Sequence, residues 1–507
     1  MPTIPDDVLR HIYTLLDYST LLNCRFLSRD SALPATALAF RHVRLETSGD
    51  VLPFIKISKS EHLRCWVREV TVDASRPPQA WQCSGSEEAL LQHGLFILTL
   101  PRLRLFSRML VLNVRLQLDL PERFPPPDNL VHETSALLPY QSLQSRILDT
   151  IFKCIIGRWT KLAQKNWQDY WLAWFDSRAS LFQPEKVQRH RLVDVLEPMS
   201  FPDQSIPLTT LTLSNLPDIV EVDLHSSQIF QDFLNSQTLT ALKILVAVRE
   251  EDRLAVEPFL QPEKFDLFEN FPSTWLAPPL ASNLTNLSLY CHGYFGWAPK
   301  LDLRRVMAGH THSCAFPNLR VLALGRYVLS HEWQITWIAS LGAENGHGGL
   351  QELYLDDCPI IWRGRTRGPM DETIDTLGSL KLDNHGYPIR GMLTGESSLD
   401  NIWDMATKDF GLRWSTVLGR WAREMQFLRA FRMGSGDWSG ENADLVAMAR
   451  TKDLNVDINR TTTTYKAWKR RSYDTVHLNY DKPSLHECLQ LNRGPPEDAT
   501  SLLRHGV

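Results

Sequence analysis

Apolar positions near the N-terminus first follow a helical period and then alternate. Pro5 suits the first position of a helix, because its missing N–H would be unpaired there in any case. Leu9, Ile12 and Leu16 recur behind it at helical spacing. Residues 40–45 then alternate apolar and polar side chains, which is typical of a half-buried strand. The pattern predicts a small helical unit that leads into a strand.

A second and a third helix are expected between those two elements. Ser19 is the predicted N-cap of the second helix, since a serine side chain can accept a hydrogen bond from the first turn. Leu21, Cys24 and Leu27 recur every third residue after it. An alanine-rich stretch at 35–39 predicts a short third helix. About 40 residues make a poor core on their own, so the unit is expected to lean on a partner or on the following domain.

Beyond residue 60, triplets of the form Leu-x-x-Leu-x-Leu predict a series of strands. Residues 350–360 match the full leucine-rich-repeat pattern, with Cys358 at the Asn/Cys position. Looser triplets begin at Val67, Leu100, Leu208, Leu239, Leu284, Leu319, Leu377 and Leu428. Helical spacing of apolar residues at 333–341 and 414–425 predicts helical returns between strands. We expect 319–324 and 350–355 to be adjacent parallel strands with their leucines facing inward.

One region interrupts this array. Residues 121–140 are rich in proline, and 143–177 has a helical pattern in which Trp167, Trp171 and Trp174 share one face. An aromatic stripe at helical spacing favours a buried face, although a partner-binding face remains open. The predicted domains are a helical unit (1–46), first repeat-like strands (47–120), a Pro-rich joint with a helical insertion (121–207), a leucine-rich-repeat-like array (208–485) and a tail (486–507).

Composition and charge limit the classes of partner and the cellular compartment that the sequence predicts. Among the 507 residues, 54 Lys and Arg face 58 Asp and Glu, a net charge of −4. No general footprint for nucleic acid or an anionic membrane follows from that balance. Arginines interrupt the most apolar stretch, so no membrane span is expected, and charges near the N-terminus argue against a signal peptide. The eight cysteines lack paired spacing, so reduced thiols in the cytoplasm or nucleus are predicted.

Candidate chemistry is sparse. Cysteine and histidine gather at 291–292 and 310–314 without the spacing of known zinc modules, so no metal is predicted. Glycines at 434–440 depart from phosphate-binding fingerprints, and a turn is the better interpretation. The basic cluster at 466–471 is interpreted as a solvated face. We therefore expect no catalytic residue and no cofactor, and an enzyme hidden in 121–207 or 390–490 is only an alternative.

The N-terminal pattern resembles an F-box, in the form common at the start of fungal F-box proteins. The residues that carry the resemblance are Ile4-Pro5-Asp6-Asp7-Val8-Leu9, Ile12, Leu15-Leu16, Leu21-Leu22, Cys24-Arg25, Leu27-Ser28-Arg29 and the segment 40–45. Ile4 replaces the commoner leucine before the proline. Asp30-Ser31-Ala32 stands where the family often has an aromatic residue. The fold class expected is α/β: an N-terminal helical F-box, then an irregular leucine-rich-repeat-like solenoid with a helical insertion.

The resemblance implies a substrate-recognition subunit of an SCF (cullin–RING) ubiquitin ligase. The F-box would bind the Skp-type adaptor and, through it, cullin, and the repeat array would bind an unknown protein target for ubiquitin-dependent degradation. The residues implied in adaptor binding are Ile4, Pro5, Val8, Leu9, Ile12, Leu16, Leu21, Leu22 and Leu27. The alternative is a non-ligase protein-interaction scaffold with a divergent F-box, which the departure at Asp30 would suit.

Target binding is expected on residues between or just after the strand leucines, because packing fixes the leucines themselves. These residues are Tyr354, Asp356, Asp357, Arg326 and Lys381. They combine an aromatic ring with both charge signs, which suits a protein surface better than a polyanion or a lipid.

Overall fold

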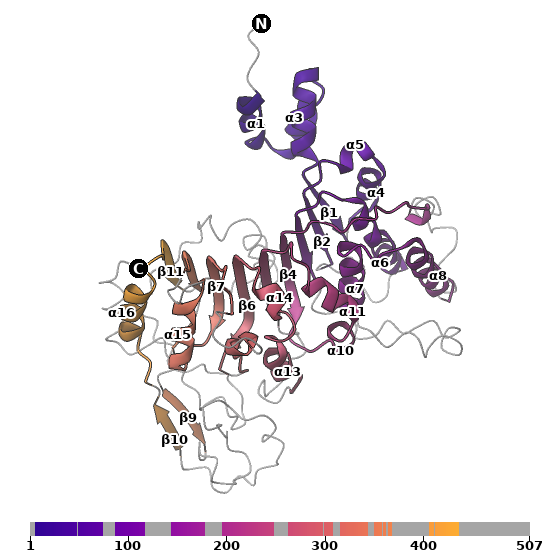
Figure 1. Ribbon diagram of the computed structural model, residues 1–507. Helices are drawn as coiled ribbons and strands as arrows, with labels where there is room; N and C mark the ends of the chain where they lie inside the picture. Colours follow the sequence, from indigo (N-terminus) through magenta and orange to yellow (C-terminus); the bar gives the residue numbers. More distant parts are fainter. Residues whose placement is uncertain are drawn as a thin grey trace. The chain divides into compact units, whose positions relative to one another are not determined.

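The computed structural model describes residues 6–47, 49–74, 87–116, 143–177, 195–247, 262–297, 299–307, 315–342, 349–356, 358–360, 363–367, 405–409 and 411–434. The fold is an α/β mixture with parallel strands. Two compact units divide the chain: Met1–Leu213 with Glu221–Leu239, and Ser214–Val220 with Thr240–Val507. Figure 1 shows the order of the elements along the chain. The five-part division expected from sequence stays a prediction.

Three short helices open the first unit: α1 (Asp6–Thr14), α2 (Tyr18–Cys24) and α3 (Arg29–Ala39). Asp17, and not the predicted Ser19, is the N-cap of α2, because its carboxylate accepts from the Thr20 amide at 2.9 Å. Hydrogen bonds from the side chains of Ser19 and Thr20 hold the pKa of the Asp17 carboxyl well below its usual range. A small core of buried residues joins the helices: Tyr13, Leu21, Cys24, Ala35, Ala39 and Phe40.

Parallel strands follow in the first unit. Strands β1 (His42–Glu46), β2 (Glu69–Asp73) and β3 (Val111–Arg115) pair in sequence order. Between them lie α4 (Leu52–Lys59), α5 (Glu61–Arg64), α6 (Glu87–Thr99) and the 3₁₀ helix η2 (Leu100–Leu105). Val43, Val70 and Leu112 are aligned and buried. Because side chains alternate along a strand, the residues directly before and after each of them in the sequence face the other side of the sheet.

The triplet at Leu100 was expected to be a strand, and that prediction is wrong. Residues 100–105 form η2, and the strand lies later, at β3. Apolar residues three apart also stack on one side of a 3₁₀ helix, and Pro101 suits a helical first turn. The other triplets before residue 360, and the triplet at Leu428, do fall on parallel strands. The triplet at Leu377 lies outside the described residues.

The helical insertion packs as core. Helices α7 (Leu143–Ile155) and α8 (Lys161–Ser177) cover this region. The Trp167 indole N–H donates to the Ile97 carbonyl at 3.2 Å, and Trp171 is fully buried, as expected for a core-facing stripe. The Trp174 side chain lies outside the described residues. Phe152 stacks on Phe233 of α11 (Gln228–Leu234), with ring centroids 4.3 Å apart, and α10 (Val222–His225) lies just before it in the chain.

Parallel strands of the second unit are β5 (Ala241–Ala247), β6 (Asn286–Phe295), β7 (Val321–Tyr327), β8 (Glu352–Asp356) and β11 (Ala430–Gly434), paired in that order. Strand β4 (Thr210–Pro217) is divided between the units. Leu322 aligns with Leu353, and Leu324 with Leu355, all four fully buried. The prediction that 319–324 and 350–355 lie on adjacent parallel strands is confirmed.

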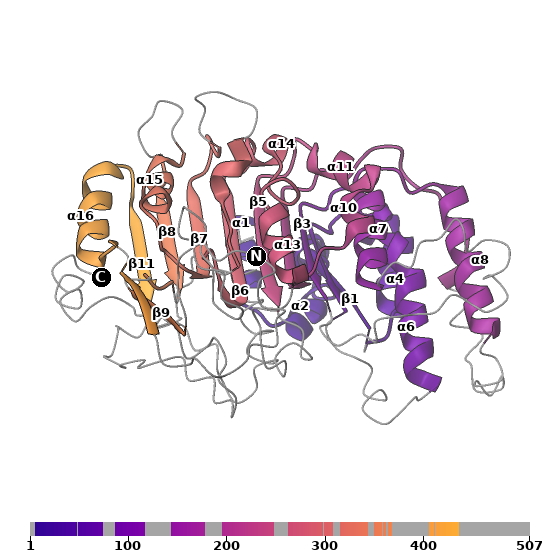
Figure 2. The same ribbon diagram turned by 90° about the horizontal axis from the view of Figure 1, so that it is seen from below.

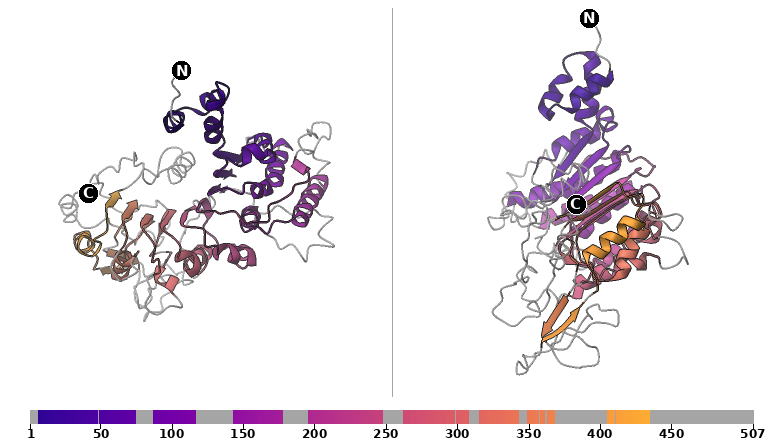
Figure 3. Two further views of the ribbon diagram at one scale, coloured as in Figure 1. Left: turned by 45° about the horizontal axis from the view of Figure 1, so that its top comes forward. Right: turned by 90° about the vertical axis from the view of Figure 1, so that its left-hand side faces the viewer.

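Helices of the second unit are α13 (Pro262–Asn270), α14 (Pro278–Ala281), η4 (Leu303–Met307), α15 (Glu332–Ser340) and α16 (Trp414–Glu424). The predicted returns at 333–341 and 414–425 are therefore helical. Helices α15 and α16 lie on one side of the strands of this unit (Figures 2 and 3). The Trp421 indole N–H donates to the Ile335 carbonyl at 3.1 Å and joins the two helices. An antiparallel pair, β9 (Arg363–Arg367) and β10 (Met405–Asp409), stands apart from the parallel strands.

The start and end of α15 are fixed by polar contacts and a glycine. The Gln334 side chain accepts from the backbone amides of Ser330 and His331 and donates to the Tyr327 hydroxyl at 2.9 Å. Gly342 then has a φ of 71°, a left-handed conformation that glycine adopts without a steric cost. Within the described ranges, no helix is both long and apolar enough to cross a membrane.

Candidate functional site

Large apolar side chains are unusually exposed on the N-terminal helices. The described part of the chain has eleven exposed large hydrophobic residues, and seven of them fall between residues 8 and 33. We call these seven the N-terminal apolar surface: Val8, Ile12, Leu15, Tyr18, Phe26, Leu27 and Leu33. Leu15, Phe26 and Leu27 are 74%, 82% and 73% exposed. Isolated surface leucines are ordinary, but this concentration of exposed large apolar side chains within one small helical unit is typical of an interaction surface.

The residues predicted to bind an adaptor separate into three groups. Val8, Ile12 and Leu27 belong to the N-terminal apolar surface. Leu9, Leu16 and Leu22 are partly buried and pack against the small core of the helical unit. Leu21 is buried, with 7% of its surface exposed, so its expected place on the docking surface is corrected to one in the core. Ile4 and Pro5 lie outside the described residues.

The adaptor-binding residues predicted from the sequence did not include four members of this surface: Leu15, Tyr18, Phe26 and Leu33. A signal existed for Leu15, which shares a helical stripe with Val8 and Ile12 at steps of four and three residues. No sequence pattern indicated that Phe26 is exposed, because a phenylalanine after a helix is equally consistent with a buried position in the core.

The expected target-binding residues do not form one exposed surface. Tyr354 is buried, with 3% exposed, and packs with Leu245, Tyr290 and Ala323, which corrects the expectation that it is solvent-facing. Its hydroxyl donates to Glu352 at 2.7 Å. Asp356 is also buried, and Arg326 is half-buried with a left-handed φ of 61°. Asp357 and Lys381 lie outside the described residues.

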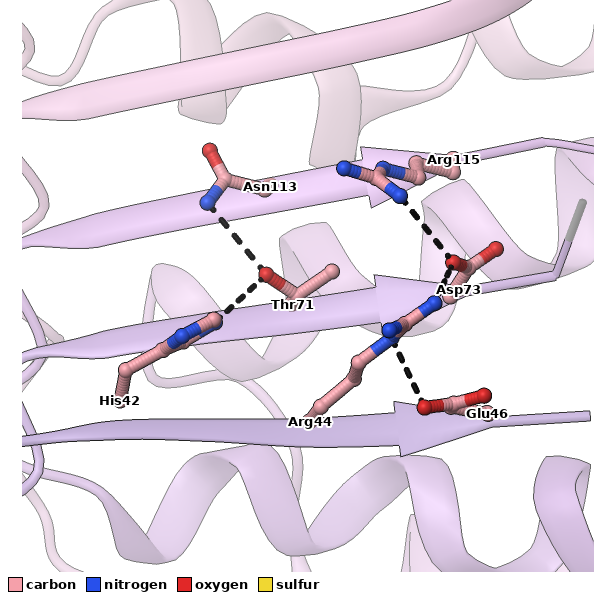
Figure 4. Close-up of polar contacts among 7 residues, drawn as sticks. All are labelled: His42, Arg44, Glu46, Thr71, Asp73, Asn113 and Arg115. Carbon is pink, nitrogen blue, oxygen red and sulfur yellow. Dashed lines mark hydrogen bonds and ion pairs between the residues drawn. The ribbon is translucent and has the colours of Figure 1, made fainter. Parts of the chain in front are cut away.

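A row of polar side chains covers the other face of β1, β2 and β3, opposite the aligned apolar residues. Figure 4 shows the members of this polar face: His42, Arg44, Glu46, Thr71, Asp73, Asn113 and Arg115. His42 Nε2 lies 2.8 Å from the Thr71 hydroxyl, and the Asn113 amide nitrogen donates to Glu69 at 2.7 Å. Thr71 and Asn113 are almost fully buried, and His42 is exposed. The polar face is therefore exposed at β1 and increasingly buried toward β3.

Negatively and positively charged side chains alternate along the polar face. Arg44 contacts Glu46 at 2.9 Å and Asp73 at 2.5 Å, and Arg115 reaches the same oxygen of Asp73 at 3.4 Å. Asp73 has 2% of its side chain exposed and Arg115 10%, whereas Arg44 has 39%. Burial lowers the pKa of Arg115, against the opposing effect of Asp73. The buried end of this chain of charges is thus a cation.

Nucleophilic and metal-binding candidates receive no support from the described residues. Cys291 is buried, and the neighbouring side chains of the predicted cysteine–histidine group lie outside the described part. In the described ranges, no group of three or more His, Cys, Asp or Glu could hold a metal ion. Burial raises the pKa of the Cys154 thiol well above its usual range, which leaves it a weak nucleophile.

No model of a known protein family matches the chain, and no curated protein matches it in sequence.

Proposed function

We propose that this protein is the substrate-recognition subunit of an SCF-type (cullin–RING) ubiquitin ligase. Its N-terminal helical unit is an F-box that binds a Skp-type adaptor, and its parallel strands are an irregular leucine-rich-repeat-like array that binds a protein target. The chain contributes no catalytic residue, and ubiquitin transfer belongs to the enzyme that the RING subunit binds.

The observation that carries this proposal is the N-terminal apolar surface. Three helices bury only a small core, yet they hold seven of the eleven exposed large hydrophobic residues in the described part of the chain. A unit of this size gains little stability from its own core. Burying its exposed side chains against an adaptor would contribute roughly 1.5–3 kcal/mol for each one that is fully covered.

Charge substitution on this surface is the direct test. Ile12→Asp with Leu15→Asp should weaken the complex of the full chain with a Skp-type adaptor by about a hundredfold or more, because two contact side chains become charged. Both residues are exposed in the free chain, at 41% and 74%. Thermal unfolding should therefore be nearly unchanged. The affinity is measured by titration of purified adaptor.

The matched control places the same charges elsewhere. Leu162→Asp with Val222→Asp alters two side chains that are 67% and 68% exposed outside the N-terminal apolar surface. This variant should bind the adaptor as the unaltered chain does. Equal adaptor binding by both double variants would remove the F-box assignment.

Co-purification distinguishes a ligase subunit from a non-ligase scaffold. A ligase subunit should bring cullin along with the adaptor, whereas a non-ligase scaffold with a divergent F-box should bring the adaptor alone. Asp30-Ser31-Ala32 keeps the second reading open, because it departs from the family's usual aromatic residue.

A further inference from the structure

The guanidinium of Arg25, at the end of α2, is held in a fixed position beside the N-terminal apolar surface. Its Nε donates to the Thr36 hydroxyl of α3 at 3.0 Å. Its central carbon lies over the Phe40 ring, 4.8 Å from the centroid, and 5.9 Å from the centroid of the Phe26 ring. A cation within about 6 Å of an aromatic face is attracted to it. One hydrogen bond and two rings therefore orient this group.

The two terminal nitrogens of Arg25 are unused and accessible. Within the described residues, Arg25 has no carboxylate partner and no hydrogen-bond acceptor other than Thr36. The side chain is half-buried, and neither terminal nitrogen is among the buried atoms that lack a partner. Both nitrogens are therefore open to solvent. Their donors form a planar fork that matches the two oxygens of a carboxylate.

The turn that follows Arg25 is fixed by hydrogen bonds, although its apolar side chains are exposed. The Leu27 amide and the Ser31 hydroxyl both donate to the Cys24 carbonyl, at 3.3 and 3.0 Å. Phe26 and Leu27 on this turn are 82% and 73% exposed. Ordering of loops and side chains opposes association. A backbone that is already held in place reduces that cost, so Arg25, Phe26 and Leu27 form a preorganised contact.

We infer that Arg25 binds the carboxylate of an aspartate or glutamate of the adaptor through its two terminal nitrogens. Apolar side chains of the adaptor cover Phe26 and Leu27 next to this ion pair. A wholly apolar partner does not fit, because covering Phe26 would bury the neighbouring guanidinium without a counter-charge, which is costly. The inference rests on the proposed function, since it takes the adaptor as the partner, and it adds the chemistry that the adaptor must present.

The first test measures the affinity of the full chain for purified Skp-type adaptor over a range of salt concentrations. Arg25→Met keeps an apolar side chain beside Phe40 and removes the charge, so the affinity at low salt should fall by about tenfold or more. Because salt screens ion pairs, rising salt should weaken the unaltered complex more than the variant complex. A loss of packing alone would not change this salt dependence. Arg108→Met, which removes an exposed cation outside the three N-terminal helices, should change neither quantity.

The second test locates the carboxylate. A carbodiimide joins a lysine amine to a carboxylate only where the two groups are in contact. In the complex formed by Arg25→Lys, the reagent should therefore link position 25 to one aspartate or glutamate of the adaptor, which mass spectrometry identifies. Arg108→Lys offers the same amine elsewhere and should give no such link. Replacing the identified acid with its amide should weaken the unaltered complex, and this loss should not add to that of Arg25→Met.

Three results would overturn the inference. The first is an unchanged affinity and salt dependence in Arg25→Met, and the second is a complex of Arg25→Lys that yields no link from position 25. In both of these cases the adaptor still binds, so the F-box proposal stands. The third is a dimer of the unaltered chain, detected by light scattering, that Arg25→Met dissociates, because the surface would then belong to a second copy. A failure of the unaltered chain to bind the adaptor would remove both proposals.

Discussion

Replacing Leu353 with aspartate is expected to destabilise the second unit by about 4 kcal/mol or more, enough to unfold it at 37 °C. Leu353 is fully buried and lies between Leu322 of β7 and Phe431 of β11. An aspartate there would lose the apolar contacts of the leucine and bury a carboxylate among apolar neighbours. Urea unfolding monitored by tryptophan fluorescence measures the change in the free energy of unfolding.

Two control variants accompany Leu353→Asp. Leu353→Met keeps the volume and polarity of the site, so its cost should stay below about 1.5 kcal/mol. Phe427→Asp introduces the same charge where the native side chain is 58% exposed, and its cost should be within about 0.5 kcal/mol. A small effect of Leu353→Asp would contradict the buried position of this residue.

The sequence predicted strand positions correctly where the second and third leucines of a Leu-x-x-Leu-x-Leu triplet are both buried in the structure. Leu322 and Leu324 of β7, and Leu353 and Leu355 of β8, are such pairs. The same triplet failed at Leu100, because apolar residues three apart also fit a 3₁₀ helix. Long-range contacts distinguish η2 from the strands. The arginines of η2 reach carbonyls about 90–100 residues away, and no local pattern encodes such a contact.

Exposure was harder to predict than secondary structure. Tyr354 occupies a position between strand leucines, where a solvent-facing residue was expected. It is buried instead, because Leu245, Tyr290 and Ala323 bring apolar surface to the same face. The N-terminal helices show the converse. Leu21 and Leu27 follow one period-three pattern, yet one is core and the other is 73% exposed.

The polar face could not be predicted from the sequence as one connected set of contacts, although each strand carries part of its pattern. Arg44 and Asp73 are 29 residues apart, and Asp73 and Arg115 are 42 apart. Parallel pairing in register brings them together, and that register depends on the buried apolar residues. Polar side chains at alternate positions of β1 and β2 indicate a polar face, but the burial of this face toward β3 is visible only in three dimensions.

Acidification is expected to destabilise the first unit between pH 6.5 and about 4. Burial lowers the pKa of His93 of α6 and of His225 of α10 from 6.5 to about 4 in each case. Both imidazoles are therefore neutral in the folded chain throughout this range, whereas in the unfolded chain they bind protons below pH 6.5. Because the unfolded state binds more protons, the free energy of unfolding falls as the pH falls through this window.

His93 offers the sharper test, since it is almost fully buried. A shift from 6.5 to about 4 corresponds to about 3 kcal/mol of stability lost near pH 4 relative to pH 7. His93→Leu removes the proton-binding group, so its urea-unfolding free energy should vary with pH by about 3 kcal/mol less than that of the unaltered chain. His62→Leu, at an exposed histidine of the same unit, is the control. An identical pH dependence in all three proteins would mean that the His93 imidazole gains a proton in the folded chain as readily as in the unfolded one.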